Sequence, residues 1–168
     1  MKNLNISLAF LGLFAVSTPT LAAGTSTGAL TVGATFTTQC TVSAANLSFG
    51  TTIPSPVNSN VDVQSNVTAI CSLGTPYKIG MGMGSFTPTD GCGGERRMIG
   101  PGGTVRYSLY TDANRGNSWG NGDPACPNVA SDTGSGLAQT IPVFARIPTG
   151  QTPAPGNFTD TVQVTISW

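Results

Sequence analysis

The stretch Gly28–Phe36, GALTVGATF, alternates apolar and polar residues with the period of two that is typical of a β-strand. Leu30, Val32, Ala34 and Phe36 fall on one face of this strand. An apolar face of this kind has to be buried, and we expect it to be buried in a neighbouring copy of the same chain. The alternative is that the segment is the first strand of its own sandwich and pairs within one chain.

The residues before this stretch have the layout of a secretory signal peptide. Lys2 supplies the charged start, Leu8–Val16 supplies the apolar run, and small residues follow it. The apolar run is too short to span a bilayer, so we expect it to be removed. Cleavage after Ala22 and cleavage after Ala23 both stay open.

With the later cleavage site, the chain is expected to have three parts. Residues 1–23 are the signal peptide, residues 24–36 are an N-terminal extension, and residues 37–168 form one domain with a single core. Only 8% of the residues are charged, where roughly 25% is usual in soluble domains, and 39% are hydrophobic. This composition suits an exported all-β protein.

The charge distribution gives no reason to expect a nucleic-acid partner. The formal net charge is zero, with seven basic and seven acidic residues. The closest cations, Arg96, Arg97 and Arg106, are too few to follow a phosphate backbone.

Short alternating segments with turn residues between them predict an all-β sandwich without helices. The expected strands are Thr37–Val42, a short piece at Asn46–Gly50, Val61–Cys71, Tyr77–Met83, Thr104–Tyr110, Pro142–Ile147 and Phe158–Trp168. This is about six full strands, whereas an immunoglobulin-type sandwich needs at least seven. The shortage lies at the C-terminal end, where the last strand reaches the final residue.

Two long glycine-rich segments, Thr87–Gly103 and Asp112–Ser135, are expected to be mostly loop. In the strand Tyr77–Met83, Gly80 and Gly82 lie on the outer face, where they allow another backbone to approach closely. Weak packing is the alternative interpretation of these two glycines.

No enzymatic function is expected. The chain has no histidine, which removes the commonest general base, and its seven acidic residues are scattered along the sequence. Asp112, Asn114 and Asp123 resemble part of a calcium loop, but Gly116 and Asn117 stand where a ligand and the required glycine belong. We therefore expect neither a metal nor a cofactor.

Two aromatic residues, Tyr110 and Trp119, are expected to serve in packing, as aromatic residues beside strands and in long loops commonly do, with a surface-binding patch as the alternative. The four cysteines are Cys40, Cys71, Cys92 and Cys126. An even number of cysteines behind a secretory signal predicts two disulfides, and three pairings are possible on paper.

Several motifs occur in an order and spacing that resemble a known family. They are the alternating leader ahead of Cys40-Thr41-Val42, Phe49-Gly50, Cys71 at the end of a strand, Tyr107-Ser108-Leu109-Tyr110-Thr111-Asp112, Val143-Phe144-Ala145-Arg146-Ile147, and Phe158-x-Asp160-Thr161-Val162-x-Val164-Thr165-Ile166. The chain resembles the Csu-type, or archaic, chaperone-usher pilus subunits, which share the spore coat protein U domain.

The resemblance implies an incomplete immunoglobulin-like β-sandwich that is completed by a donor strand from another subunit. Its implied partners are other copies or related pilus subunits, a periplasmic chaperone and an outer-membrane usher. The donor residues would be Leu30, Val32, Ala34 and Phe36, and the edge of the acceptor groove would be formed by Val162, Val164, Ile166 and Trp168.

The resemblance also implies a family disulfide between Cys40 and Cys71. The second pair, Cys92 with Cys126, departs from the pattern of the major subunit, as does Phe158 where the family more often has tyrosine. We expect a structural pilus subunit that is exported to the periplasm and then displayed on the cell surface, where it serves adhesion and biofilm formation. The alternatives are a secreted non-fimbrial coat or matrix protein and a carbohydrate-binding tip module.

Overall fold

The computed structural model describes residues 23–86 and 95–168. The chain divides into a first unit that ends at Thr35 and a second unit, Phe36–Trp168. Residues 23–35, the described part of the first unit, form no helix or strand. The expected signal peptide lies outside the described residues except for its last position, Ala23.

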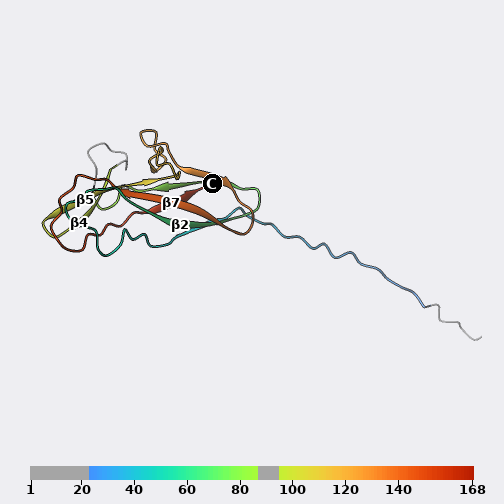
Figure 1. Cartoon of the computed structure of the whole chain (residues 1–168). Coiled ribbons are helices and arrows are strands. Elements are labelled where there is room, and N and C mark those ends of the chain that lie inside the picture. The colour runs from blue at the N-terminus through green and yellow to red at the C-terminus, as the bar shows by residue number, and fades with distance from the viewer. Residues whose placement is uncertain (1–22, 87–94) are drawn as a thin grey trace, which may run out of the picture. The chain divides into compact units, whose positions relative to one another are not determined.

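The second unit is built from strands in two antiparallel sheets (Figure 1). The strands are β1 Cys40–Ala44, β2 Val61–Cys71, β3 Pro76–Met81, β4 Arg96–Gly100, β5 Gly103–Tyr110, β6 Ala130–Thr133, β7 Ala138–Ile147 and β8 Val164–Ser167. The larger sheet has the order β1-β2-β7-β5-β4, and the smaller has the order β6-β3-β8. The predicted all-β sandwich is therefore confirmed, although the expected count of about six strands was too low.

The core lies on the faces that period-two alternation predicts. Val67, Ala69 and Cys71 of β2 are buried, and so are Tyr77, Ile79 and Met81 of β3 and Val105, Tyr107 and Leu109 of β5. These side chains belong to one apolar cluster that draws on both sheets. Alternation identified them because a half-buried strand sends every second side chain inward.

Strand β4 was not predicted, because Arg96–Gly100 falls in a segment that the sequence indicated to be loop. Its first residue, Arg96, is fully buried. The guanidinium donates hydrogen bonds to the carbonyl oxygens of Gly82, Met81 and Trp119, at 2.8, 3.0 and 2.7 Å. A buried charge is tolerated only when its hydrogen bonds are made, and here the acceptors come from distant parts of the chain.

Trp119 is fully buried, which confirms its expected role in packing and contradicts the alternative of a surface-binding patch. Its indole Nε1 donates a hydrogen bond to the carbonyl oxygen of Ile79 at 2.8 Å. The loop that carries Trp119 crosses β3, and a Cβ at Gly80 would lie 2.5 Å from the Asn121 carbonyl oxygen. This confirms the prediction that Gly80 allows another backbone to approach closely.

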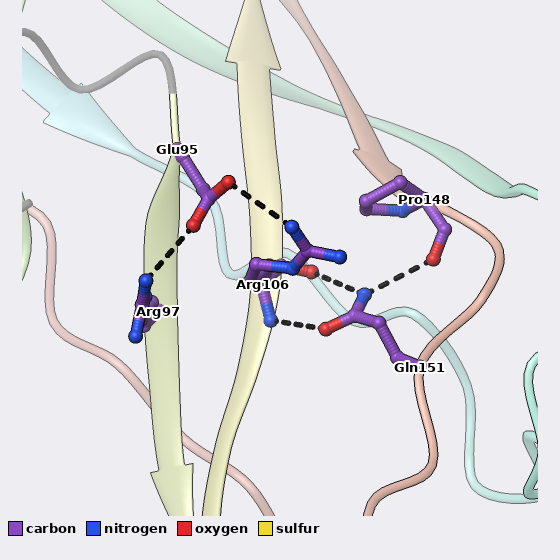
Figure 2. Close-up of polar contacts among 5 residues, drawn as sticks. All are labelled: Glu95, Arg97, Arg106, Pro148 and Gln151. Atoms are coloured by element: carbon purple, nitrogen blue, oxygen red, sulfur yellow. Dashed lines mark hydrogen bonds and ion pairs between the residues drawn. The ribbon is translucent and has the colours of Figure 1, made fainter. Parts of the chain in front are cut away.

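The backbone pairing of β7 with β5 ends before Pro148. Beyond that point the side chain of Gln151 takes the place of a backbone partner for β5. The pairing of Ser108 with Arg146 sets Pro148 opposite Arg106, where proline has no N–H to donate. The Gln151 side chain accepts a hydrogen bond from the Arg106 N–H at 2.7 Å and donates to the carbonyl oxygens of Arg106 and Pro148, both at 3.0 Å (Figure 2). Gln151 is buried and satisfies the peptide group that β7 leaves unpaired.

In Figure 2, Glu95 bridges two arginines across the β4–β5 hairpin. Its carboxylate oxygens lie 3.1 Å from Arg97 and 3.4 Å from Arg106. All three side chains are substantially exposed, so this bridge adds little stability compared with the buried contacts of Gln151.

Asp160 anchors the segment that leads into β8. One carboxylate oxygen accepts hydrogen bonds from the N–H groups of Ser85 and Thr161, at 2.6 and 2.8 Å, and the other accepts from the Tyr107 hydroxyl at 2.6 Å. Burial and the contact with Asp160 raise the pKa of the Tyr107 hydroxyl well above its usual value. The segment is thereby tied both to β5 and to the residues after β3.

A disulfide joins Cys40 to Cys71, as the family resemblance implied. These residues are direct partners in the pairing of β1 with β2, at the first residue of one strand and the last of the other. Cys126 is also disulfide-bonded, and its expected partner Cys92 lies outside the described residues. The Cys40–Cys71 bond fixes one end of β1, an edge strand.

Replacing both Cys40 and Cys71 with serine is expected to lower the free energy of unfolding by roughly 3 to 4 kcal/mol, because the bond closes a loop with a sequence separation of 31. Guanidinium denaturation followed by the fluorescence of buried Trp119 measures this change. Ser43→Ala, an exposed substitution on the same strand, serves as the control and should leave the midpoint unchanged. An unchanged midpoint in the double variant would contradict the prediction.

Tyr107→Phe is expected to lower the free energy of unfolding by about 1.5 to 3 kcal/mol, because it removes a hydrogen bond from a buried hydroxyl to a charged, partly buried carboxylate. Tyr110→Phe is the matched control, since the structure gives the half-exposed Tyr110 hydroxyl no hydrogen bond within the described residues. The same denaturation assay compares the two variants. Equal midpoints would show that the Asp160 contact does not stabilise the domain.

Candidate functional site: an open groove between two strand edges

Two edge strands of the sandwich face each other across the two sheets. β1 pairs only with β2, and β8 pairs only with β3, within the part of the chain that the structure describes. The two strands approach each other closely in space. Each therefore presents a row of peptide groups on its free side, which is the arrangement that accepts an added strand.

An open groove of about 520 Å³ lies next to these edges. It begins at Ala44 and Val164, the last residue of β1 and the first of β8, and continues along Ala45–Phe49 and Phe158–Val162. The groove is therefore a gap in the sandwich at the point where both edge strands end.

The floor of the groove is the hydrophobic core itself. Val67, Met81, Leu109 and Val143 are buried core residues that also line the groove. Leu47, Phe49 and Phe158 are partly buried side chains of its walls. The Phe49 ring meets the Tyr107 ring edge to face, with 6.0 Å between their centroids. The sandwich thus leaves apolar surface accessible that a complete sandwich would cover.

Three polar side chains that line the groove, Tyr107, Asp160 and Ser65, are hydrogen-bonded within the domain. The hydroxyl of Tyr107 is bonded to Asp160, and the carboxylate of Asp160 accepts three hydrogen bonds in all. Ser65 donates to the carbonyl oxygens of Ala45 and Asn46, at 3.2 and 3.1 Å. With these three side chains bonded internally and a floor of core residues, the groove suits an apolar occupant.

The alternating N-terminal segment has its apolar side chains in solvent. Leu30, Val32 and Phe36 are 88%, 85% and 93% exposed, and Ala34 is exposed as well. Three large apolar side chains on one face of an extended segment, all exposed, form the kind of surface that proteins use for binding partners.

The four residues predicted to edge an acceptor groove have different positions. Val162 and Val164 line the groove. Ile166 packs against the core and is opposite Ile79 in the pairing of β3 with β8. Trp168 follows the end of β8 and is 59% exposed.

The opposite wall of the groove, Ala44–Phe49, was not predicted, nor was the contact between Tyr107 and Asp160. The sequence predicts a short strand at Asn46–Gly50, which contains Leu47 and Phe49. A local pattern does not say which edge of the sandwich such a segment will face. Asp160 was noted only as part of a family motif. Its hydrogen-bond partners are 75 and 53 residues away in sequence, and no local signal pointed to them.

The suspected calcium loop is an ordinary turn around Asp112. Its carboxylate accepts hydrogen bonds from the N–H groups of Gly116 and Asn117, at 3.2 and 2.8 Å. These bonds hold the pKa of Asp112 below its usual value. Residues 23–86 and 95–168 contain no group of three potential metal ligands, and no helix among them is long and apolar enough to cross a membrane.

Comparison with known proteins places this architecture in context. No curated protein matches the chain. Among solved structures, one match is the CsuC–CsuE chaperone-tip adhesion subunit pre-assembly complex from archaic chaperone-usher Csu pili of Acinetobacter baumannii. The match has 24% sequence identity and a TM-score of 0.55, and it covers 78% of this chain and 40% of that chain. The two share an immunoglobulin-like β-sandwich fold.

The model of one protein family, the Spore Coat Protein U domain, matches residues 26–165. This match spans most of the chain, from the alternating N-terminal segment into β8. The chain therefore belongs to the Spore Coat Protein U domain family.

Proposed function

We propose that this chain is a structural subunit of an archaic chaperone-usher pilus, and that it assembles by inserting residues 28–36 of one copy into the groove of the next. One observation carries the proposal: a single chain combines an open apolar groove between two strand edges with an exposed segment that alternates like a strand. Its family and its fold, which it shares with a complex from Csu pili, support this function.

The groove and the segment are chemically complementary. A strand laid in the groove along Ala45–Phe49 or Phe158–Val162, the segments that continue from the ends of β1 and β8, would hydrogen-bond with its backbone and send every second side chain toward the groove floor. Leu30, Val32, Ala34 and Phe36 are the side chains with that spacing. Burying these four side chains, to which Ala34 adds least, contributes on the order of 5 to 10 kcal/mol before backbone hydrogen bonds are counted.

Insertion between copies produces a fibre. Each chain donates at its N-terminal segment and accepts at a groove elsewhere on the domain, so the contact is head-to-tail and does not close into a dimer. The floor of the groove is formed by apolar core residues, which agrees with a structural role.

A subunit of this kind needs protection before it assembles. An open groove with free strand edges is an aggregation hazard until something covers it. We infer that a periplasmic chaperone covers it after export and that an outer-membrane usher joins the subunits at the cell surface. Adhesion and biofilm formation follow as the functions of the finished pilus.

Deleting residues 24–36 is expected to abolish polymerisation, because it removes the donor and leaves the groove. The full chain and the deletion variant are expressed in the bacterial periplasm, and the products are run unheated on a denaturing gel. The full chain should give a heat-sensitive ladder, and the deletion variant should give none. When the two are expressed together, the deletion variant should end growing chains and shift the ladder to shorter species. A full chain that runs only as a monomer would refute strand exchange.

Val32→Asp is expected to eliminate the ladder, because it would bury an unpaired carboxylate among apolar side chains at a cost of several kcal/mol. Thr31→Asp is the matched control: it adds the same charge one residue away, on the opposite face of the strand. The control should retain the ladder in the same unheated gel assay. A ladder in both variants would show that Val32 does not enter the groove.

A further inference from the structure

Three exposed apolar side chains gather at the end of the domain that carries the Cys40–Cys71 disulfide. Leu73, Leu137 and Ile70 are 81%, 73% and 47% exposed. Leu73 lies in the turn between β2 and β3, and Leu137 directly precedes β7. We call these three residues the disulfide-end patch.

The segments that carry the three residues are neighbours in space, although two of them are far apart in sequence. The N–H of Gly136, next to Leu137, donates to the Cys71 carbonyl oxygen at 3.1 Å. A Cβ at Gly136 would lie 3.8 Å from the Cβ of Leu73. Ile70 is opposite Ala138 in the pairing of β2 with β7, one residue beyond Leu137. The two connections that carry the leucines are therefore packed side by side.

The N-terminal extension joins the domain at this same end. The N–H of Ser72 donates to the Gln39 carbonyl oxygen at 2.9 Å, and the N–H of Gln39 donates to the Ser72 hydroxyl oxygen at 3.0 Å. Leu73 is the next residue after Ser72. The base of the extension is thus hydrogen-bonded beside the patch.

The length of the connection limits how far away an acceptor copy can lie. Between Phe36, the last predicted donor residue, and Cys40 there are only Thr37, Thr38 and Gln39. Three residues span roughly 10 Å when fully extended. Gln39, the last of these three residues, is held in place by its hydrogen bonds to Ser72. A copy that holds Phe36 in its groove must therefore lie against the disulfide end of the donor domain.

We propose that the disulfide-end patch is a second contact between subunits, packing against the same copy that receives the extension. The inference rests on the proposed strand exchange and adds a domain-to-domain contact to it. The partner is a second copy because the connection brings that copy, and not another protein, to this end of the domain. Exposed leucines at an assembly contact become buried when the fibre forms, which accounts for their presence on the surface of an exported protein.

The test places the photoreactive residue p-benzoylphenylalanine at Leu73 or at Leu137 in the full chain, expressed in the periplasm as above. Ala113 is the control position, because it is exposed and its loop contacts Asp62, at the other end of β2 from Ile70. Unheated gels first show that the ladder has formed. Samples are then irradiated and heated, which dissolves the ladder and leaves only covalent products.

We expect heat-resistant dimers of this chain when the photoreactive residue is at Leu73 or at Leu137. We expect no such dimers when it is at Ala113. A ladder without heat-resistant dimers at either leucine would overturn the second contact while leaving strand exchange intact. Covalent products with a different protein, identified by mass spectrometry, would overturn the choice of partner. Absence of the ladder from the unmodified chain would overturn both proposals.

Discussion

The structure depends on one constraint: every backbone N–H and C=O group of a strand needs a partner, and β1 and β8 each have a free side. In a complete sandwich another strand would cover the gap between them. Here an open groove reaches the core instead, and Val67, Met81 and Leu109 line it. In the strand exchange proposed above, the exposed, alternating segment 28–36 of one copy would supply the missing strand to the next.

An open groove is useful only if it does not collapse, and buried polar contacts hold its surroundings in place. Asp160 ties the strand that leads into β8 to Tyr107 and Ser85. Arg96 joins β4 to the end of β3 and to the loop at Trp119. Such contacts are directional, and each would leave a buried polar group unpaired if the groove closed by moving these segments. They stabilise an arrangement that hydrophobic burial alone would not favour.

Few residues of the chain are charged, so few ion pairs can form. With few ion pairs available, the fold relies on hydrogen bonds from uncharged side chains to the backbone, as Gln151 shows where β7 gives way to Pro148. The surface ion pair between Asp62 and Arg146 joins β2 to β7 with two contacts of 2.7 Å, and it lowers the pKa of Asp62. Being partly exposed, it contributes less than the buried contacts do.

Features that depend on local periodicity could be predicted from the amino-acid sequence. Alternation identified the buried faces of β2, β3 and β5, and it identified the apolar face of Gly28–Phe36, because side-chain direction in a strand follows from position along the chain. The number of cysteines alone left three disulfide pairings possible. The resemblance to a known family added the Cys40–Cys71 bond, which the structure contains.

Features whose partners are distant in sequence became visible only in the folded domain. Strand β4 was missed because a buried arginine becomes acceptable only when carbonyl groups from β3 and Trp119 surround it. A packing role was expected for Trp119, but its full burial depends on a loop folding over β3. The second wall of the groove, Ala44–Phe49, was missed for the same physical reason: the edge that a short segment will face is set by how the two sheets pack, and no local pattern encodes it.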